Sequence, residues 1–489
     1  MYRANIFRTT AWYPQAPLKS VARCITQAMS VILVLTTQLV TLMAIMVAAK
    51  ATSKGADQLQ DCFNRDRDKL APYYIRDFAR GQPSKLTIHS VLWSTKIESE
   101  QQPSSNSSSS ATVPAYPLTI VTMATQHRLS NLEAQCNSWQ GPVTAAVYVP
   151  LLLGDDAGNT ASLRRVQAST QQLFKRMESR PASCALRLLL MAEILGEAAA
   201  RPLFPINSLR NAALLASDTP LVAMIDTDLL LSSSLATELK GSSSSAAEVV
   251  RLCRAGNMLV LPAFEPCHER KFTLEKGMQV ADKAAQVGKE QLVKLVKANQ
   301  MCYFMKSWPA GHGATNSEAW YKSPWPYKVH HTPRYEPWYI VDRSLNPWYD
   351  ARFRGYGWNK QQQITAAVLG SKLSLMVHPA AYVVHRPHEK SKVAGIRNNA
   401  GKARDNPQVE KHTTSLIHRL QAPRASGASL SDREVGLLIN KLMEDLYKAG
   451  VKRLRAGDTY DYRLDPPVSR CLQELPWWNE QQQQNISSS

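Results

Sequence analysis

Apolar and polar positions follow two alternating periods in the central part of the chain. Five apolar runs of strand length occur there, and segments with a helical pattern separate them, among them Arg164 to Glu178 and Ser208 to Ala216. The runs are PLTIVTMAT, GPVTAAVYVPLL, CALRLLLMAE, PLVAMID and NMLVLPAF. Strands that alternate with helices predict an α/β domain built on a largely parallel sheet. Ligand sites in such sheets gather at the carboxyl ends of the strands.

The N-terminal part has a different pattern. From Cys24 to Ala49 run 26 residues without a charge, and about 20 apolar residues suffice to cross a bilayer. Four basic residues precede this run. We therefore predict a cytosolic tail at 1–23, a transmembrane signal anchor at 24–49 and a lumenal remainder. The alternative is a plant-type transit peptide, because the first 23 residues are basic and lack acidic side chains.

The rest of the chain divides by composition into three further segments. Residues 50–112 end in QQPSSNSSSSAT and predict a stem that is partly of low complexity. The α/β domain is expected at 113–395. Residues 396–489 are expected to hold a basic loop, an amphipathic helix from about Ser431 to Lys448, and a polar tail.

The formal net charge of +19 indicates an anionic partner. Residues 1–56 contribute six basic and no acidic side chains, and 386–424, a stretch typical of a loop, contribute nine basic and three acidic ones. No helix shows a basic stripe with interleaved aromatics, so nucleic acid is not a predicted partner. Seven cysteines lie beyond the anchor with no CxxC pair, so at least one is free or intermolecular if the others form disulfides.

Two carboxylates, Asp226 and Asp228, follow the apolar run LVAMI. A buried charge is costly unless a counter-charge or a metal meets it, and oxygen ligands suit Mg²⁺ or Mn²⁺, which can also bridge phosphates. Upstream, Asn207 and Arg210, and Asn207 and Asn211, share one face of a short predicted helix. An arginine there could hold a diphosphate or a sugar carboxylate with two parallel hydrogen bonds.

Two enzyme classes place a D-x-D at a strand end: phosphotransferases whose first Asp is a nucleophile, and nucleotide-sugar glycosyltransferases. The first class usually has this motif after its first strand and a G-D-x-x-x-D-like motif after a later strand. Here several strands precede Asp226, and the only comparable motif, GDTYD at 457–461, follows a basic helical stretch and is one residue short. The pattern therefore favours the glycosyltransferases.

Seven runs together resemble, in this order, the LARGE-type glucuronyltransferases, glycosyltransferase family 49. They are HRLSNLEAQCNSWQGPVTAAVYV, FPINSLRNAALLASDTPLVAMIDTD, LVLPAFE, HGATNSEAWY, YEPWYIVDR, NPWYDARFRGYGWNK and VVHRPH. The resemblance covers roughly Leu118 to His388. It implies a GT-A fold, which is a single Rossmann-like α/β domain, in a type II Golgi membrane protein. It also implies inverting, Mn²⁺-dependent transfer of a sugar, glucuronic acid, from a UDP-sugar to a glycan or glycoprotein.

The resemblance places Asp226 and Asp228 at the acidic motif of the family. A histidine near the C-terminal end of the domain usually completes the metal shell in GT-A enzymes, and we assign it to His385, with His388 as the alternative. This set suits Mn²⁺ better than Mg²⁺, which is the alternative ion. The predicted metal ligands are thus Asp226, Asp228 and His385, and the predicted donor-binding residues are Asn207, Arg210, Asn211, Asp226 and Lys360.

The acceptor site is expected in the loop from Gly355 to Lys360. Sugars present C–H faces that pack on aromatic rings and hydroxyls that need polar partners, so Tyr356, Trp358 and Asn359 are its candidate residues. Inverting transfer needs one general base. Glu336 and Asp350 are the two candidates, and the sequence does not choose between them.

The sequence also departs from the family. Thr227 stands between the carboxylates where the family often has a bulkier residue, a Ser-rich insertion follows the acidic pair, and a basic extension follows His388. These departures could accompany a different donor or acceptor. A second hypothesis, of a different class, is a membrane-anchored glycan-binding protein without catalysis. The intact acidic motif and the candidate histidine argue against it.

Overall fold

The computed structural model describes residues 54–96, 116–240, 243–389, 391–401, 406–422 and 430–479. The predicted tail, the predicted anchor and the Ser-rich end of the predicted stem lie outside these residues. Among the helices of the described part, none is both long and apolar enough to span a membrane.

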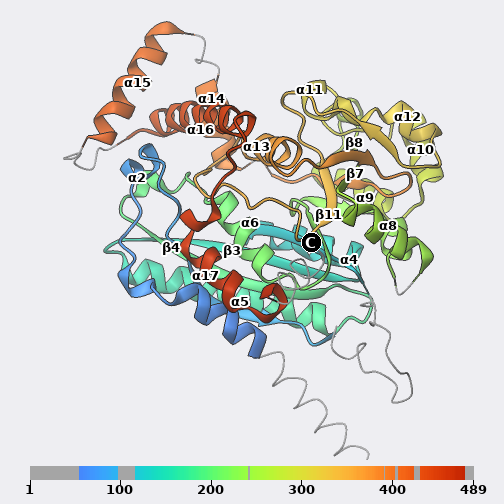
Figure 1. Cartoon of the computed structure of the whole chain (residues 1–489), viewed down its shortest axis with the longest axis horizontal. Helices are drawn as coiled ribbons and strands as arrows, with labels where there is room; N and C mark the ends of the chain where they lie inside the picture. Colours follow the sequence, from blue (N-terminus) through green and yellow to red (C-terminus); the bar gives the residue numbers. More distant parts are fainter. Residues whose placement is uncertain are drawn as a thin grey trace, which may run out of the picture. The chain divides into compact units, whose positions relative to one another are not determined.

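A nine-stranded sheet forms the centre of the described unit (Figure 1). In spatial order its strands are β1 (Thr87–Trp93), β4 (Ala185–Leu195), β3 (Pro142–Leu152), β2 (Leu118–Thr125), β5 (Leu221–Met224), β11 (Trp338–Asp342), β7 (Asn257–Leu261), β12 (Ser374–Val377) and β10 (Tyr327–Val329). Strands β4, β3, β2 and β5 are parallel, whereas β1, β11 and β10 run antiparallel to their neighbours. The α/β prediction is confirmed, with a mixed sheet.

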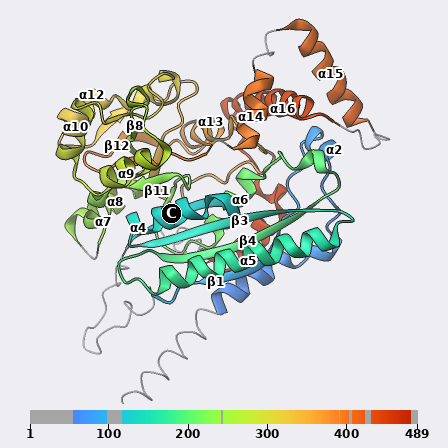
Figure 2. The ribbon, with the colours of Figure 1, turned by 180° about the vertical axis from the view of Figure 1, so that it is seen from behind.

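Both faces of this sheet are buried, because side chains of successive strand residues point to opposite sides. In β2, Leu118 and Ile120 join the apolar cluster that contains Leu173 of α5 (Asp156–Glu178). Val121 and Met123 join the other cluster, with α6 (Ile206–Leu215). Helix α5 runs along one face in both views (Figures 1 and 2). Burial on both faces explains why these runs are continuously apolar rather than alternating.

A second, four-stranded sheet follows the acidic pair. Its order is β6 (Leu229–Leu231), β13 (Val383–His385), β8 (Ala263–Pro266) and β9 (Met301–Tyr303). Besides α5 and α6, the α-helices between β2 and β13 are α4 (Leu129–Ser138), α7 (Ser233–Glu238), α8 (Ser244–Arg254), α9 (Leu274–Ala285), α10 (Lys289–Lys297), α11 (Pro309–His312), α12 (Ser317–Lys322) and α13 (Asn359–Thr365). This sheet brings strands from distant parts of the chain beside the end of β5.

Part of the predicted stem belongs to the folded unit. Residues 54–64 are helical, α2 (Ile75–Ala79) follows, and β1 forms the edge of the main sheet. A disulfide joins Cys62 to Cys471 of α17 (Pro466–Glu474). The stem assignment is therefore corrected for 54–96. The sequence did not show this, because β1 has only one buried residue, Ile88, and lacks a strong apolar signal.

The prediction that at least one of the seven cysteines is free if the others form disulfides is confirmed for the described residues. Besides the Cys62 bridge, disulfides join Cys136 to Cys184 and Cys267 to Cys302, and Cys253 is free and buried. Three disulfides are typical of a protein that folds in an oxidising compartment.

The basic stretch after His388 is not one loop. It contains α14 (Lys392–Gly401) and α15 (Pro407–Gln421), and α16 (Asp432–Arg455) follows with a capping box between Ser431 and Glu434. Leu416 and Leu420 of α15 share an apolar cluster with α16. The loop prediction was wrong here because the many charges hid the helical spacing of the few apolar positions.

Candidate active site

The acidic pair lies in a tight turn directly after β5. The Ile225 backbone N–H still donates to Val121 of β2, and Leu229 N–H donates to the Asp226 carbonyl at 2.9 Å, which closes the turn. The Thr227 side chain is buried, and its hydroxyl donates to the Met123 carbonyl. The middle residue thus fixes the turn to the sheet, and its small side chain fits this buried position.

Strand pairing brings two histidines to Asp228. Strand β13 pairs antiparallel with β6 so that His385 stands opposite Leu229, and Arg386 N–H donates to the Asp228 carbonyl at 2.7 Å. His388 Nε2 lies 2.8 Å and His385 Nε2 lies 3.8 Å from Asp228 Oδ2. One ligand atom from each of the three side chains lies within 4.8 Å of the others. His388 therefore joins His385 in this cluster rather than replacing it.

The charges in the cluster suit metal binding. Burial lowers the pKa of His385 to about 4, which keeps its imidazole neutral and able to bind a metal. Burial alone would raise the pKa of Asp228, but the hydrogen bond from His388 and the electrostatic interaction with the His385 side chain bring it below its ordinary value. A carboxylate and two imidazoles are ligands that Mn²⁺ and other divalent transition metals accept.

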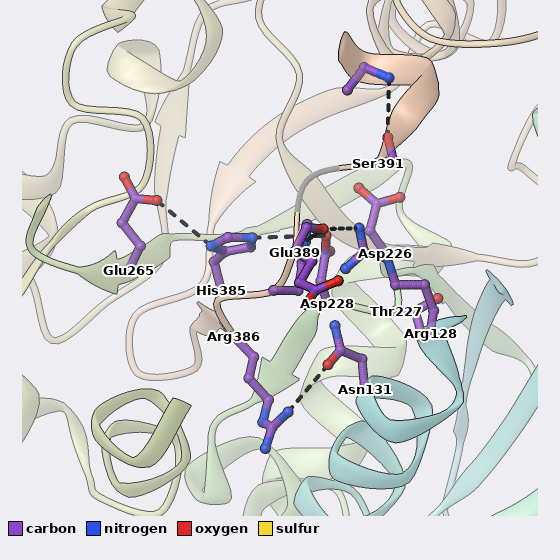
Figure 3. A network of polar contacts seen from close by, with 12 residues as sticks. Arg128, Asn131, Asp226, Thr227, Asp228, Glu265, His385, Arg386, Glu389 and Ser391 are labelled. Atoms are coloured by element: carbon purple, nitrogen blue, oxygen red, sulfur yellow. Dashed lines mark hydrogen bonds and ion pairs between the residues drawn. The ribbon is translucent and has the colours of Figure 1, made fainter. Parts of the chain in front are cut away.

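Side chains around the cluster hold it in place (Figure 3). Glu265 of β8 lies 3.7 Å from His385 Nδ1, on the side opposite Asp228. Arg386 contacts Asp282 of α9 and Asn131 of α4. Arg128, which follows β2, donates to the Glu389 carbonyl at 3.1 Å. Glu265 can thus orient the His385 ring, and Arg128 adds positive charge beside the cluster.

Asp226 lies among cations instead of histidines. Its Oδ1 accepts from Arg210 Nη2 at 3.1 Å, and its Oδ2 accepts from Lys360 Nζ and Trp338 Nε1, each at 3.2 Å. Burial raises the pKa of Asp226, but the Lys360 and Arg210 charges outweigh this and hold it well below its usual range. Asp226 and Asp228 are thus separated by only one residue but have different surroundings.

The three predicted donor-binding residues of α6, Asn207, Arg210 and Asn211, lie on that helix as predicted. Their side chains, however, already form hydrogen bonds with other residues of the protein. Arg210 is almost fully buried and also donates to Asn207 and Asn359. Asn207 donates to the Asp350 carbonyl, and Asn211 donates to the Tyr349 carbonyl. These contacts tie α6 to the segment 349–359 and make Arg210 a support for Asp226. Lys360 remains partly exposed and can reach a ligand.

The two candidate bases lie in different surroundings. Glu336 Oε1 lies 3.9 Å from His312 Nε2, and the Glu336 charge acts on Lys360, which itself binds Asp226. Asp350 is buried and forms an ion pair with Arg352 at 2.6 Å. Within the described residues, Asp350 contacts Arg352 and Asn207 and forms no hydrogen bond or ion pair with the acidic pair. Glu336 is therefore the candidate that the geometry brings to the site.

The predicted acceptor loop is only partly open. Tyr356 is 51% exposed, whereas Trp358 stacks on Tyr447 of α16 at 4.8 Å and Asn359 is buried against Arg210. Gly355 has φ +74°, and a side chain there would press against α16. The loop conformation thus serves packing on α16 as well as the presentation of Lys360.

Sequence reasoning overlooked three side chains at this site: Arg128, His312 and Trp338. Trp338 binds Asp226, and the His312 ring stacks on it at 5.3 Å with an angle of 5° between the planes. Both histidine and tryptophan stand in motifs that are rich in aromatics, where a single ring gives no signal of its own. The pairing of β11 with β5 brings Trp338 to the acidic turn, and His312, which ends α11, reaches it by stacking on that ring.

Comparison with protein families defines the class of enzyme, one that transfers sugars. The family described as "Glycosyl-transferase for dystroglycan" matches residues 159–419, which is more than half of the chain. The chain therefore belongs to this family of glycosyltransferases.

Individual relatives agree with that assignment. The human xylosyl- and glucuronyltransferase LARGE2 is 30% identical over 338 residues, which cover 69% of this chain and 40% of the relative. The rat LARGE2 protein is 31% identical over 277 residues, or 56% of this chain and 35% of the relative. This chain thus spans well under half the length of these relatives. The solved structure of S. aureus TarS 1-349 with UDP-GlcNAc covers 75% of this chain and 92% of its own at 11% identity, with a TM-score of 0.28, too low to establish a shared fold.

Proposed function

We propose that this chain is a metal-dependent, inverting glycosyltransferase of GT-A fold that transfers a sugar from a UDP-sugar to a glycan acceptor. The observation that carries the proposal is the convergence of Asp228, His385 and His388 on one point beside Asp226. The order of strands β4, β3, β2, β5, β11, β7 and β12, with the acidic turn at the carboxyl end of β5, supports the GT-A assignment. Glucuronic acid is the proposed sugar, because the relatives are named xylosyl- and glucuronyltransferases.

The residues present fit a divalent cation, and we assign Mn²⁺ to Asp228, His385 and His388. Such an ion offsets the negative charge that develops on a leaving diphosphate. Asp226 was predicted as a ligand too, but Arg210, Lys360 and Trp338 already bind both of its oxygens. Its proposed task is to hold Lys360 toward the donor.

Glu336 is the proposed general base. The acceptor oxygen forms its bond to the anomeric carbon while the bond from that carbon to the UDP oxygen breaks. The electron pair of the broken bond leaves with UDP, and the Glu336 carboxylate takes the proton of the acceptor hydroxyl. Lys360 and Arg128 supply positive charge for the donor phosphates or for a sugar carboxylate. Arg210 does not take this role, because its side chain is buried and already forms hydrogen bonds within the protein.

A membrane-anchored enzyme of the Golgi lumen remains the proposed location. The three disulfides support a lumenal position of the folded unit. The excess positive charge suits an anionic donor and an acidic membrane surface.

The test is UDP release by the purified full chain with a panel of UDP-sugars, in the presence and absence of a glycan acceptor mixture and Mn²⁺. A fragment that begins near residue 113 is unsuitable, because it lacks β1 and the Cys62 disulfide partner. We expect release from one donor, and a loss of at least about 100-fold in Asp228→Asn or after chelation.

The matched control is Glu248→Gln, which removes an exposed carboxylate and is expected to keep full activity. Specific sugar or glycan binding without UDP release from any donor, by a chain shown to be folded, would instead favour the glycan-binding protein without catalysis. Equal activity with and without chelator would refute the metal assignment.

A further inference from the structure

Helix α4 turns one stripe of side chains toward the acidic turn. The helix packs on β6, the strand that follows the acidic pair. Gln135 is buried, and its Nε2 donates to the carbonyls of Asp226 and Leu229 at 3.0 and 2.9 Å. Asn131 lies four residues before Gln135, and Arg128 lies three residues before Asn131. Residues at this spacing share one face of a helix, so Asn131 lies beside the same turn.

The Asn131 side chain has a buried nitrogen without a partner. Asn131 is 3% exposed, and its Oδ1 accepts from Arg386 Nη1 at 3.2 Å. Because a guanidinium only donates, the atom that faces Arg386 must be the amide oxygen, and this places Nδ2 on the other side of the amide. Among the residues that the structure describes, Nδ2 has no hydrogen-bond partner. Buried polar atoms in native proteins nearly always have one, which indicates a ligand or water at this atom.

This nitrogen faces the proposed metal ligands. In Figure 3 it points away from Arg386 and toward Asp228. Arg386 holds the two groups together, because its backbone N–H donates to the Asp228 carbonyl at 2.7 Å while its side chain binds the amide. Arg128 lies nearby: it donates to the Glu389 carbonyl at 3.1 Å, and the Asp228 charge acts on its guanidinium. An uncharged donor and a permanent cation thus lie together beside the acidic motif.

The chemistry of these groups selects the ligand. Asn131 Nδ2 and the Arg128 guanidinium can only donate, so the ligand must supply acceptor oxygens, and the cation favours a negative charge on them. A phosphate group meets both conditions. The carboxylate of Asp228 would repel a phosphate, but the divalent cation proposed at Asp228 offsets that charge.

We propose that Asn131 is a donor-binding residue whose Nδ2 donates to a phosphate oxygen of the nucleoside diphosphate, beside the positive charge of Arg128. The inference rests on the transferase function proposed above and adds a contact outside the set predicted on α6. The same hydrogen bond strengthens as negative charge develops on the leaving diphosphate, so Asn131 supports bond breaking as well as binding.

The experiment measures ligand binding apart from turnover. UDP binding to the purified full chain is followed by calorimetry in the presence of Mn²⁺, and Mn²⁺ binding alone by electron paramagnetic resonance. Uridine, which has no phosphate, is the second ligand and is followed by saturation-transfer NMR without metal. The variants are Asn131→Asp and Asn131→Leu. The matched controls are Asn137→Asp and Asn137→Leu, at an exposed position of the same helix.

The two variants separate three roles of Asn131. If the residue only holds Arg386, Asn131→Asp is harmless, because a carboxylate accepts from a guanidinium at least as well as an amide does. If only a change of charge matters, Asn131→Leu is harmless, because Leu is neutral and of similar size. Both variants lack the N–H donor, so only the loss of that donor weakens UDP binding in both.

We expect both Asn131 variants to raise the Kd of UDP about 10-fold or more, because each loses a hydrogen bond to a charged group. The affinity for uridine should stay within about twofold, and the affinity for Mn²⁺ should not fall. In transfer assays the donor KM should rise while the acceptor KM stays within about twofold. Both Asn137 variants should match the wild type.

An unchanged Kd of UDP in either Asn131 variant would overturn the proposal. Equal weakening of uridine and UDP would also overturn it, because Asn131 would then bind the base or the ribose. A wild-type chain that binds no UDP would refute both this inference and the transferase function. UDP binding that weakens as expected, in a chain that transfers no sugar, would refute the transferase function alone.

Discussion

The ion pair between Arg354 and Glu193 offers a sharp test of how the active-site loop is supported. Both side chains are fully buried, and Arg354 Nη1 donates to Glu193 Oε1 at 3.0 Å. Arg354 Nε also donates to the Leu203 carbonyl at 2.9 Å, and the guanidinium lies 3.8 Å from the centre of the Tyr73 ring. The next residue, Gly355, begins the loop that ends at Lys360, so the pair anchors this loop to the end of β4.

The change is Arg354→Met, which keeps the aliphatic packing and leaves a buried carboxylate without its counter-charge. The expected loss is about 3–5 kcal/mol of unfolding free energy. Adding Glu193→Gln should restore part of the lost unfolding free energy, because Gln is uncharged. Its amide oxygen can still accept from the Lys85 backbone N–H, which lies 2.7 Å from Glu193 Oε1 in the wild-type structure. The order of stability is thus wild type, then the double variant, then Arg354→Met.

The assay is urea unfolding followed by tryptophan fluorescence, with free energies from linear extrapolation. The control is Arg251→Met, which breaks a pair whose side chains are 65% and 52% exposed and should cost less than about 1 kcal/mol. If Arg354→Met costs no more than this control, or if the double variant is less stable than Arg354→Met, the reasoning on the buried charge is refuted.

Two further predictions concern pH and the donor. Burial raises the pKa of Asp465, at the start of α17, from 3.8 to about 7, so the folded state binds its proton more tightly than the unfolded state. The contribution of this group to the unfolding free energy is complete below about pH 4 and decreases by about 4 kcal/mol at most as the pH rises to 7. In Asp465→Asn the urea midpoint should therefore depend less on pH across this range. An unchanged pH profile in this variant would contradict the assignment. Arg128→Met should raise the donor KM about 10-fold with a smaller change in acceptor KM, whereas the exposed Arg201→Met should not, as initial-rate kinetics would show.

What the sequence predicts well is what local pattern decides. The five apolar runs predicted β2, β3, β4, β5 and β7 of the main sheet, and the carboxylates after LVAMI predicted the acidic turn at a strand end. The division of labour between Asp226 and Asp228 could not be read in this way, because it depends on which side chains distant strands bring near. Lys360 and His388 lie 134 and 160 residues from the aspartates that they contact.

The elements that sequence reasoning missed share a physical cause. Strand β1 is an edge strand with a weak apolar pattern, and α15 hides three core residues among charges. Asn131 shows the limit most clearly, since its proposed role comes from an amide nitrogen without a partner among the described residues and from a contact with Arg386. Neither property exists before the chain has folded.

The bridge between Cys62 and Cys471 has a consequence for the order of events during synthesis. The two cysteines are 409 residues apart, so the first has left the ribosome long before the second is made. In the meantime Cys62 has no native partner, while Cys136 and Cys184 emerge and can already pair with each other. The N-terminal helix is thus the first part of the folded unit to be synthesised and the last to be fastened covalently.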